Sequence, residues 1–541
     1  MNGCRLAQLE TSLPWKTALS AVTALLLVAP DLAHGAPPQV SSSVAQCSAL
    51  QSADFSQLQD APTQITETKF LDANTDRPES CQIGGYVAPN VGFVLRLPGD
   101  WNGKLIQRGC GGYCGSTEKV IEGCNEFLRR GYACIVSEGG HRSTSGDALW
   151  AYNNLQAEVD FGYRAPHVTT LAGKALVERY YGRPASRSYF IGTSTGGRQA
   201  LMEAQRFPWD FDGILAGVPS LGVPFLEMTL LWGSRALLDR ASGKALLRPE
   251  DLALLHRAVL ESCDLNDGIK DGLIGDPRSC AFDPEALRCL GRTTDCLNDP
   301  QLQAVSKIYR GPVTSTGMQI YPPGAMRGSE LSWTDWFSPN AGVSDEFRYS
   351  AFDPDPGPRW NPQDFDFDRD YKRMGVAEGL YSATNPDLRR FKAAGGKLLA
   401  YAGWNDAGGM SLPAVDYYEM VERAMGGRVS TQSFFRLFVI PGMNHGPTVP
   451  DGVFVVDWLS YLEAWVEKDR APDELIVSHI NLDGFDLRNV EDLNRLERLQ
   501  RLPTDPATIE FSRPVYPYPI QARYTGHGDP KVAASFRPVN K

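Results

Sequence analysis

The chain of 541 residues carries a formal net charge of −11, which argues against nucleic acid or an anionic membrane as its partner. Hydrophobic residues make up 42% of the sequence and charged residues 22%, as in globular proteins, and the length allows a large buried core. The 52 glycines and 38 prolines indicate many loops rather than disorder, because no low-complexity tract or repeat is present.

Residues 1–35 have the pattern of an export signal peptide. Arg5 and Lys16 precede an apolar run over 17–29, and Ala33-His34-Gly35 provides the small residues that a signal peptidase reads. An anchoring helix is the alternative, but this run is too short to span a bilayer of about 30 Å. We therefore expect a protein that is secreted or exported to the periplasm, with no membrane segment in its mature part.

Strands alternate with helices over residues 36–220, the first part of the expected core. Short apolar runs predict strands at 92–97, 104–107, 133–137, 188–191 and 213–216. A helix is predicted at 168–181. Such alternation is typical of a mostly parallel sheet with helices on both faces, an α/β fold.

The alternation fades over residues 221–390, which are predicted to form an inserted lid. This stretch holds four cysteines, many prolines and aromatic residues such as Trp333 and Trp336. The strand pattern then resumes at 397–401 and 434–440, so residues 391–541 are expected to complete the core and add a C-terminal tail.

The pentapeptide Gly192-Thr193-Ser194-Thr195-Gly196 lies where a predicted strand turns into a helix. A helix over 197–204 follows it and ends before Phe207-Pro208. A sharp turn of this kind exposes the serine hydroxyl, and the flanking glycines remove side chains that would collide there. The pattern predicts a nucleophile elbow with Ser194 as the nucleophile.

Two later strands each end in a residue that could activate this serine. Asp406 follows the strand at 397–401, and His445 follows the strand at 434–440. A histidine can take the proton of the serine hydroxyl, and a carboxylate fixes the tautomer of that histidine. The chain order Ser, Asp, His is that of α/β-hydrolases. His141 is the rival for the histidine and Asp416 the fallback for the carboxylate.

The oxyanion hole is expected from the Thr195 N–H and from an early glycine loop. Gly109-Cys110-Gly111-Gly112 follows the predicted strand at 104–107, which is the place for such a loop, and we choose Gly111 within it. An ordinary glycine turn is the alternative interpretation.

Ten cysteines remain once Cys4 is removed with the signal, and an even number in an exported chain favours disulfides. Zinc thiolates are the rival interpretation. Cys110 and Cys114 have tolerable zinc spacing, but Cys124 and Cys134 are badly spaced for the second pair.

A loop in the predicted lid concentrates three carboxyl groups. Asp264, Asp267 and Asp271 lie within a few residues of one another, separated by glycines, in a loop that Cys280 closes. Such a set suits a hard cation that takes oxygen ligands, such as calcium. Asp-Gly pairs are also common turns, and the spacing alone does not decide between the two.

With these motifs, the chain resembles the tannase and feruloyl esterase family of α/β-hydrolases, which also includes the hydrolase of mono(2-hydroxyethyl) terephthalate. The resemblance runs from about Cys47 to the C-terminus. Besides the elbow and the glycine loop, it rests on motifs at 99–104, 263–280, 365–370, 403–406, 442–445 and 513–519.

The resemblance implies an α/β-hydrolase sheet with a large inserted lid and a triad of Ser194, Asp406 and His445. It also implies a structural calcium ion in the lid, bound by Asp264, Asp267, Asp271 and the carbonyls of Ile269 and Leu273.

Resemblance and proximity together imply the disulfides Cys47–Cys81, Cys263–Cys280 and Cys289–Cys296. The remaining four cysteines allow three connectivities, of which we favour Cys110–Cys134 with Cys114–Cys124.

Two departures from the family pattern stand out. The family usually has bonded cysteines directly before the serine and directly after the histidine, where this chain has Thr193 and Gly446. A tail disulfide is also replaced, at Tyr516 and Pro538. Both partners are missing in each case, so no unpaired thiol remains. The change removes a covalent clamp beside the triad without removing a reacting group, and the expected effect is on stability and substrate preference.

The function expected from these features is that of an exported serine esterase that acts on a small aromatic ester. Esters of hydroxybenzoic or hydroxycinnamic acids would be cleaved through an acyl-enzyme, with lid aromatics forming the acyl pocket. The alternatives are an esterase for aliphatic polyesters or acetylated sugars, and a non-catalytic binding protein on a hydrolase scaffold.

Overall fold

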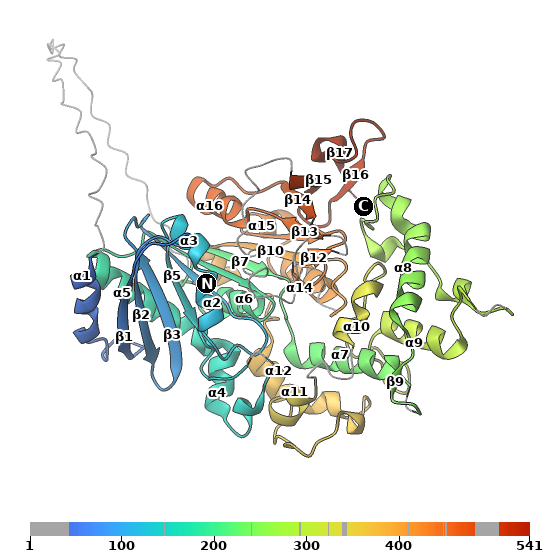
Figure 1. The fold of residues 1–541 in the computed structure, drawn as a ribbon, viewed down its shortest axis with the longest axis horizontal. Coiled ribbons are helices and arrows are strands. Elements are labelled where there is room, and N and C mark those ends of the chain that lie inside the picture. Colours follow the sequence, from blue (N-terminus) through green and yellow to red (C-terminus); the bar gives the residue numbers. More distant parts are fainter. Residues whose placement is uncertain are drawn as a thin grey trace, which may run out of the picture. The chain divides into compact units, whose positions relative to one another are not determined.

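The computed structural model in Figure 1 describes residues 43–540 except 145, 240, 292–293, 323, 338–342, 409–410, 447, 450–451 and 482–507. The predicted export signal lies outside the described residues. Within the described ranges, every helix is too short or too polar to span a bilayer.

A nine-stranded sheet forms the centre of the fold, in the order β1-β2-β3-β5-β4-β6-β7-β10-β11. The pairs β1–β2, β2–β3 and β3–β5 are antiparallel, and the other pairs are parallel. The strands are β1 (Thr63–Leu71), β2 (Ser80–Val87), β3 (Val91–Pro98), β4 (Lys104–Arg108), β5 (Ala133–Ser137), β6 (Arg187–Thr193), β7 (Gly213–Gly217), β10 (Lys397–Gly403) and β11 (Phe435–Ile440).

The predicted α/β class and all seven predicted strands are confirmed, with ends that differ by at most two residues. The strands β1 and β2 were not predicted. The edge strand β1 is partly exposed along most of its length, so its sequence mixes polar and apolar residues, whereas the inner strand β2 contains Gln82 and two adjacent glycines, which weaken its strand pattern.

Helices cover both faces of the parallel part of the sheet because alternate side chains of each strand point to opposite faces. In β10, Leu398 and Ala400 pack in the cluster that includes α14 (Ser411–Ala424). Leu399 and Tyr401 face the opposite way, and the Tyr401 ring stacks on Trp458 of α16 with centroids 4.2 Å apart.

The remaining helices of the core lie before and around these strands. They are α1 (Val44–Ala49), α2 (Glu118–Glu122), α3 (Asn125–Arg129), α4 (Leu155–Val159), α5 (Ala165–Tyr181), α6 (Thr195–Arg206), α15 (Arg428–Gln432) and α16 (Trp458–Lys468). The helices predicted at 168–181 and 197–204 are α5 and α6.

The chain between β7 and β10 is mainly helical and has a hydrophobic cluster of its own, around Trp333, Phe337 and Phe347. In Figure 1 its helices run from green to yellow. Its elements are α7 (Val223–Leu237), β8 (Leu238–Asp239), β9 (Lys244–Ala245), α8 (Pro249–Cys263), α9 (Asp299–Arg310), α10 (Trp333–Trp336), α11 (Val343–Tyr349), α12 (Gly375–Tyr381) and α13 (Arg389–Ala393). We call residues 218–396, between β7 and β10, the inserted segment.

The C-terminal part adds a small antiparallel sheet and a hairpin. The sheet has the order β12-β13-β14-β15, and β16 pairs with β17. Their bounds are β12 (Thr448–Val449), β13 (Gly452–Val455), β14 (Leu475–Asn481), β15 (Ile509–Val515), β16 (Gln521–Tyr524) and β17 (Phe536–Val539).

Five disulfides join the ten cysteines, and three of the expected pairs are confirmed: Cys47–Cys81, Cys263–Cys280 and Cys289–Cys296. With all ten sulfurs bonded to one another, the rival zinc-thiolate interpretation has no free thiolate among them.

The favoured pairing of the other four cysteines is wrong, because the structure joins Cys110 to Cys114 and Cys124 to Cys134. The reason is the position of each pair in the core. Cys110 and Cys114 belong to one loop and pack with Phe161, whereas Cys124 precedes α3 and faces Cys134 of β5 in a different cluster. Cα separations of 5.3 Å and 5.8 Å suit both observed bonds.

Candidate active site

Ser194 occupies a strained turn between β6 and α6. Its φ of 62° and ψ of −120° lie in a region that residues with a side chain rarely adopt. The turn is held by the neighbouring strand, since the Ser194 N–H donates to the Gly217 carbonyl at 3.0 Å. Backbone strain of this kind is typical of catalytic positions, where the surrounding structure maintains it.

The glycines around Ser194 allow three backbone segments to approach one another closely. A Cβ at Gly192 would lie 2.1 Å from the Gly196 carbonyl oxygen, and one at Gly197 would lie 2.3 Å from that of Gly217. Side chains at either position would therefore push the elbow apart, which is the structural reason for the glycine pattern.

His445 and Asp406 meet at the carboxyl ends of β11 and β10. The His445 Nδ1 lies 2.9 Å from the Asp406 Oδ2, and the Asp406 side chain is fully buried. The other carboxylate oxygen accepts the Gly408 N–H at 3.1 Å. With its carboxylate fixed in this way, Asp406 can orient the imidazole and stabilise its protonated form.

The turns that carry Asp406 and His445 are joined by backbone hydrogen bonds. The Asn405 N–H donates to the Met443 carbonyl at 2.9 Å, and the Trp404 N–H donates to the Ile440 carbonyl at 3.0 Å. A Cβ at Gly403 would lie 2.2 Å from the Met443 oxygen, so this close contact depends on glycine.

A cavity of about 390 Å³ opens beside Ser194. Residues of the elbow, the glycine loop, α7 and α10 line it: Gly112, Tyr113, Gly146, Phe161, Ser194, Thr195, Ser220, Val223, Leu226, Glu227, Leu230, Asp335 and Trp336. This volume and the mainly apolar lining suit a small organic ligand.

Trp336 connects the cavity to the histidine. It lines the cavity together with Ser194, and its ring contacts the His445 ring edge to face, with centroids 4.9 Å apart. Of the three predicted triad residues, Ser194 lines the cavity, and the pair of His445 and Asp406 is linked to it through Trp336. One wall of the cavity comes from the inserted segment.

The expected oxyanion donors belong to the first turn of α6 and to the glycine loop. Thr195 is buried at the first position of α6, and its hydroxyl donates to the Gly112 carbonyl at 2.7 Å. From the glycine loop, Gly112 and Tyr113 line the cavity, while Gly111 is not among the described lining residues. The choice of Gly111 stays a prediction.

The two rival triad residues are placed elsewhere. His141 is buried, stacks on Trp150 with centroids 3.7 Å apart, and its Nε2 lies 2.7 Å from the Tyr113 carbonyl oxygen. Burial lowers the pKa of His141 to about 4, so this ring is neutral and supports the glycine loop. Asp416 is exposed on α14, whereas Asp406 makes the bond to His445.

Sequence reasoning missed the acidic and phenolic side chains of the cavity. Burial and the nearby Glu346 raise the pKa of Glu227 to about 8. Burial also raises the pKa of Tyr113 well above its usual value. Tyr113 directly follows the glycine loop and could have been noticed there, but no local pattern marks Glu227 within the apolar helix α7.

The two positions beside the triad that lack the family's cysteines are Thr193 and Gly446. The Thr193 hydroxyl lies 3.3 Å from the Tyr401 hydroxyl, and a Cβ at Gly446 would have open space around it. No covalent bond therefore joins the elbow to the histidine turn at these two positions.

The acidic loop of the inserted segment has features of both interpretations given above. Asp264 accepts the N–H groups of Asp271 and Gly272, and Asp267 accepts that of Ile269, as turn residues do. Burial and the charge of Asp271 nevertheless raise the pKa of Asp267 to about 7. Arg513 neutralises part of this charge through a 2.6 Å ion pair with Asp271.

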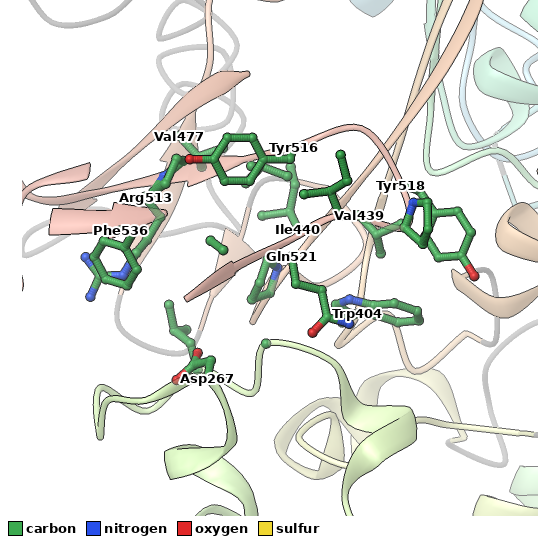
Figure 2. Close-up of a pocket in the computed structure, with 18 of the residues that line it drawn as sticks. Asp267, Trp404, Val439, Ile440, Val477, Arg513, Tyr516, Tyr518, Gln521 and Phe536 are labelled. Carbon is green, nitrogen blue, oxygen red and sulfur yellow. The ribbon is translucent and has the colours of Figure 1, made fainter. Parts of the chain in front are cut away.

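The loop also borders a small, mostly apolar cavity of about 50 Å³ against the C-terminal strands. Figure 2 shows Asp267 on the loop at one side, with Arg513 and Phe536 above it and Trp404 and Gln521 at the far side. Ionising the loop aspartates beside this mostly apolar cavity costs free energy unless a cation offsets their charge. These carboxylate oxygens therefore fit a hard cation.

One group of described His, Cys, Asp and Glu side chains has its ligand atoms within 4.8 Å of one another: His167, Glu203 and Asp210. Hydrogen bonding already satisfies part of it, since His167 Nδ1 lies 2.6 Å from Asp210 Oδ2. Burial and the charge of Asp210 raise the pKa of Glu203 well above its usual value, which favours the neutral form of this carboxyl group. The three loop aspartates are more widely spaced, but calcium bonds of about 2.5 Å place opposite ligands about 5 Å apart.

Comparison with known proteins agrees with this geometry. The family described as tannase and feruloyl esterase matches residues 76–539. The chain is 33% identical to mono(2-hydroxyethyl) terephthalate hydrolase of Piscinibacter sakaiensis, over 85% of this chain and 84% of that protein. It is 31% identical to a probable feruloyl esterase B-2 of Aspergillus flavus, over 75% of this chain and 82% of that protein.

Solved structures show the same fold. The crystal structure of feruloyl esterase B from Aspergillus oryzae superimposes with a TM-score of 0.77 and 25% identity, over 92% of this chain and 99% of that one. Tannin acyl hydrolase from Aspergillus niger has a TM-score of 0.70 at 19% identity, over 92% of this chain and 94% of that one.

Proposed function

The chain belongs to the tannase and feruloyl esterase family and is a carboxylic ester hydrolase, and we propose that Ser194, His445 and Asp406 carry out its reaction on phenolic esters. The observation that carries the proposal is the 2.9 Å contact between His445 and Asp406, beside a cavity that Ser194 and Trp336 both line.

The proposed reaction proceeds through an acyl-enzyme. The Ser194 Oγ attacks the ester carbonyl carbon while the His445 Nε2 takes its proton, and Asp406 stabilises the imidazolium. His445 then gives this proton to the leaving alcohol, and the carbon–oxygen bond of the ester breaks. Water, deprotonated by His445, attacks the acyl carbon and releases the free acid and Ser194.

The developing oxyanion is proposed to receive hydrogen bonds from the Thr195 N–H and from an N–H of the glycine loop, with Gly111 as the sequence-based choice. The first position of α6 supports the role of Thr195, because the N–H groups of a helix's first turn have no partner within the helix.

The acyl group is proposed to be a hydroxybenzoate or hydroxycinnamate. Rings of Tyr113, Phe161 and Trp336 line the cavity, and flat aromatic side chains favour a flat aromatic ligand. Glu227 and Asp335 add polar groups that can hydrogen-bond to ring hydroxyls.

A substrate panel tests this assignment. Methyl ferulate, methyl gallate and p-nitrophenyl butyrate are compared by kcat/KM for the purified protein. A preference for either phenolic ester of at least about tenfold is expected. Faster hydrolysis of the butyrate would instead assign the cavity to aliphatic acyl groups.

We further propose that calcium binds the loop through Asp264, Asp267, Asp271 and the carbonyls of Ile269 and Leu273. The ion would supply charge that offsets the repulsion among these carboxylates and would hold the loop that Cys263–Cys280 closes.

Export from the cytoplasm completes the proposal, to the periplasm or the medium. Five disulfides support it, because such bonds persist in oxidising compartments. A mature N-terminus near residue 36 in protein recovered from outside the cytoplasm is the expected result.

A further inference from the structure

The cavity beside Ser194 is acidic on the wall that the inserted segment provides. Glu227 of α7 and Asp335 of α10 both line it, and among the lining residues that the structure describes none is a lysine or an arginine. Any acyl group that reaches this wall therefore meets carboxyl groups without a compensating cation.

The Glu227 carboxyl group is suited to donate a hydrogen bond. Its neighbour Glu346 on α11 is almost fully buried, and the buried surroundings raise the pKa of Glu227 to about 8. At neutral pH the group is mostly protonated, so it offers one O–H donor and an acceptor oxygen. A phenolic hydroxyl can use both.

Arg198, a buried cation in contact with the lining residue Phe161, is bonded to other groups. Arg198 is fully buried behind Phe161, with its guanidinium carbon 4.6 Å from the centre of that ring. Its Nη1 and Nη2 donate to the carbonyls of Gly162 and Phe161 at 2.6 Å and 3.1 Å. The Arg198 charge also offsets part of the rise that burial causes in the pKa of Glu346, so this cation is engaged with protein groups and does not line the cavity.

We propose that Glu227 is a specificity-determining residue that selects acyl rings bearing a hydroxyl group, and that the cation-free wall around it excludes acyl rings bearing a carboxylate. This inference rests on the proposed function, since it concerns the acyl group in the same cavity. Monoesters of aromatic dicarboxylic acids, such as the compound for which the 33% identical relative is named, are then poor substrates of this chain.

The physical basis is the difference in what each ring substituent meets at Glu227. A hydroxyl exchanges its water contacts for a hydrogen bond with the carboxyl group. A carboxylate can accept the same O–H, but it gives up its hydration at a wall without a cation and near Glu346, whose pKa of about 6 leaves it mostly ionised at neutral pH. This balance disfavours its binding by about 100-fold.

The test compares three methyl esters that differ only at ring position 4. They are methyl 4-hydroxycinnamate, methyl cinnamate and methyl 4-carboxycinnamate, whose ring carboxylate is free. Values of kcat/KM are measured for wild type, Glu227→Lys, Glu227→Gln and Glu227→Leu. Glu261→Lys, on the exposed end of α8, is the matched charge-reversal control. Hydrolysis of p-nitrophenyl acetate, whose acyl group has no ring, reports on the triad.

Wild type and Glu261→Lys are expected to prefer the hydroxylated ester over the carboxylated one by at least about 100-fold. Glu227→Lys should shift this ratio toward the carboxylated ester by about 100-fold, because an ammonium replaces the carboxyl group. The ratio of kcat/KM for the hydroxylated ester to that for methyl cinnamate should stay within a few-fold of wild type in Glu227→Gln. In Glu227→Leu this ratio should fall by at least about tenfold.

A ratio in Glu227→Lys within twofold of wild type overturns the inference. If this variant also loses acetate hydrolysis, Glu227→Leu decides, and an unchanged preference for the hydroxylated ester overturns the inference. Failure of the proposed function gives a different result, in which wild type cleaves the acetate but none of the three cinnamate esters.

Discussion

The two walls of the active-site cavity are determined by different parts of the molecule. Ser194, Asp406 and His445 follow β6, β10 and β11, and backbone hydrogen bonds between the strand ends set their positions. Glu227 and Trp336 belong to α7 and α10, which depend on the packing of the inserted segment. The comparison indicates that the sheet positions the proposed triad, whereas the inserted segment supplies the wall proposed to select the acyl group.

The largest expected effect is that of removing the nucleophile on the sheet side. Ser194→Ala should lower kcat by 10⁴–10⁶-fold, on the order of losses seen when triad serines are removed. The melting temperature should stay close to that of wild type, since the change deletes one oxygen and keeps the elbow glycines. Retention of more than about a tenth of the activity would show that the elbow serine is not the nucleophile.

The carboxylate of the triad comes next. Asp406→Asn should lower kcat by about 10³–10⁴-fold, because an amide favours the wrong tautomer of His445. The matched control is Asp416→Asn on the exposed face of α14, which should stay within twofold of wild type. Equal losses in the two variants would contradict the geometry at His445.

A substitution on the inserted-segment side should have a smaller effect. Trp336→Ala should lower kcat/KM for phenolic esters by about tenfold, because the ring is lost both from the cavity and from the edge of His445. Trp209→Ala, 69% exposed, is the control and should change nothing measurable. A loss as large as that of Asp406→Asn would mean that the two walls are not separable.

Removal of the proposed calcium should have the smallest effect on the reaction. Chelation should lower the melting temperature by a few degrees, because an ion bound only by the native state stabilises it by mass action. Asp267→Ala should lower it similarly and become insensitive to chelator, with activity within a few-fold of wild type. An unchanged melting temperature together with no calcium by elemental analysis would leave the loop as Asp-Gly turns.

The sheet side could be predicted from the sequence in some detail. Buried parallel strands are short apolar runs, and the turns after them carry Ser194, Asp406 and His445 in the order of the fold. The edge strand β1 escaped because it mixes polar with apolar residues, and the inner strand β2 escaped because Gln82 and two glycines interrupt its apolar pattern.

The inserted segment could not be predicted to the same extent. Glu227 lies within an apolar helix, and its meaning comes only from the side chains that tertiary packing brings to it. The pairing of Cys110, Cys114, Cys124 and Cys134 failed for the same reason, since it depends on which cluster each sulfur faces.

The most direct test of the account is to trap the acyl-enzyme. His445→Ala mixed with p-nitrophenyl 4-hydroxycinnamate and quenched in acid should be examined by intact mass spectrometry and peptide mapping. Without the histidine, deacylation should be slower than acylation by this activated ester, so a 4-hydroxycinnamoyl group should accumulate on the peptide that contains Ser194. The Ser194→Ala/His445→Ala variant should show no such adduct. An adduct on another residue, or equal labelling of both variants, would contradict the claim that Ser194 is the nucleophile.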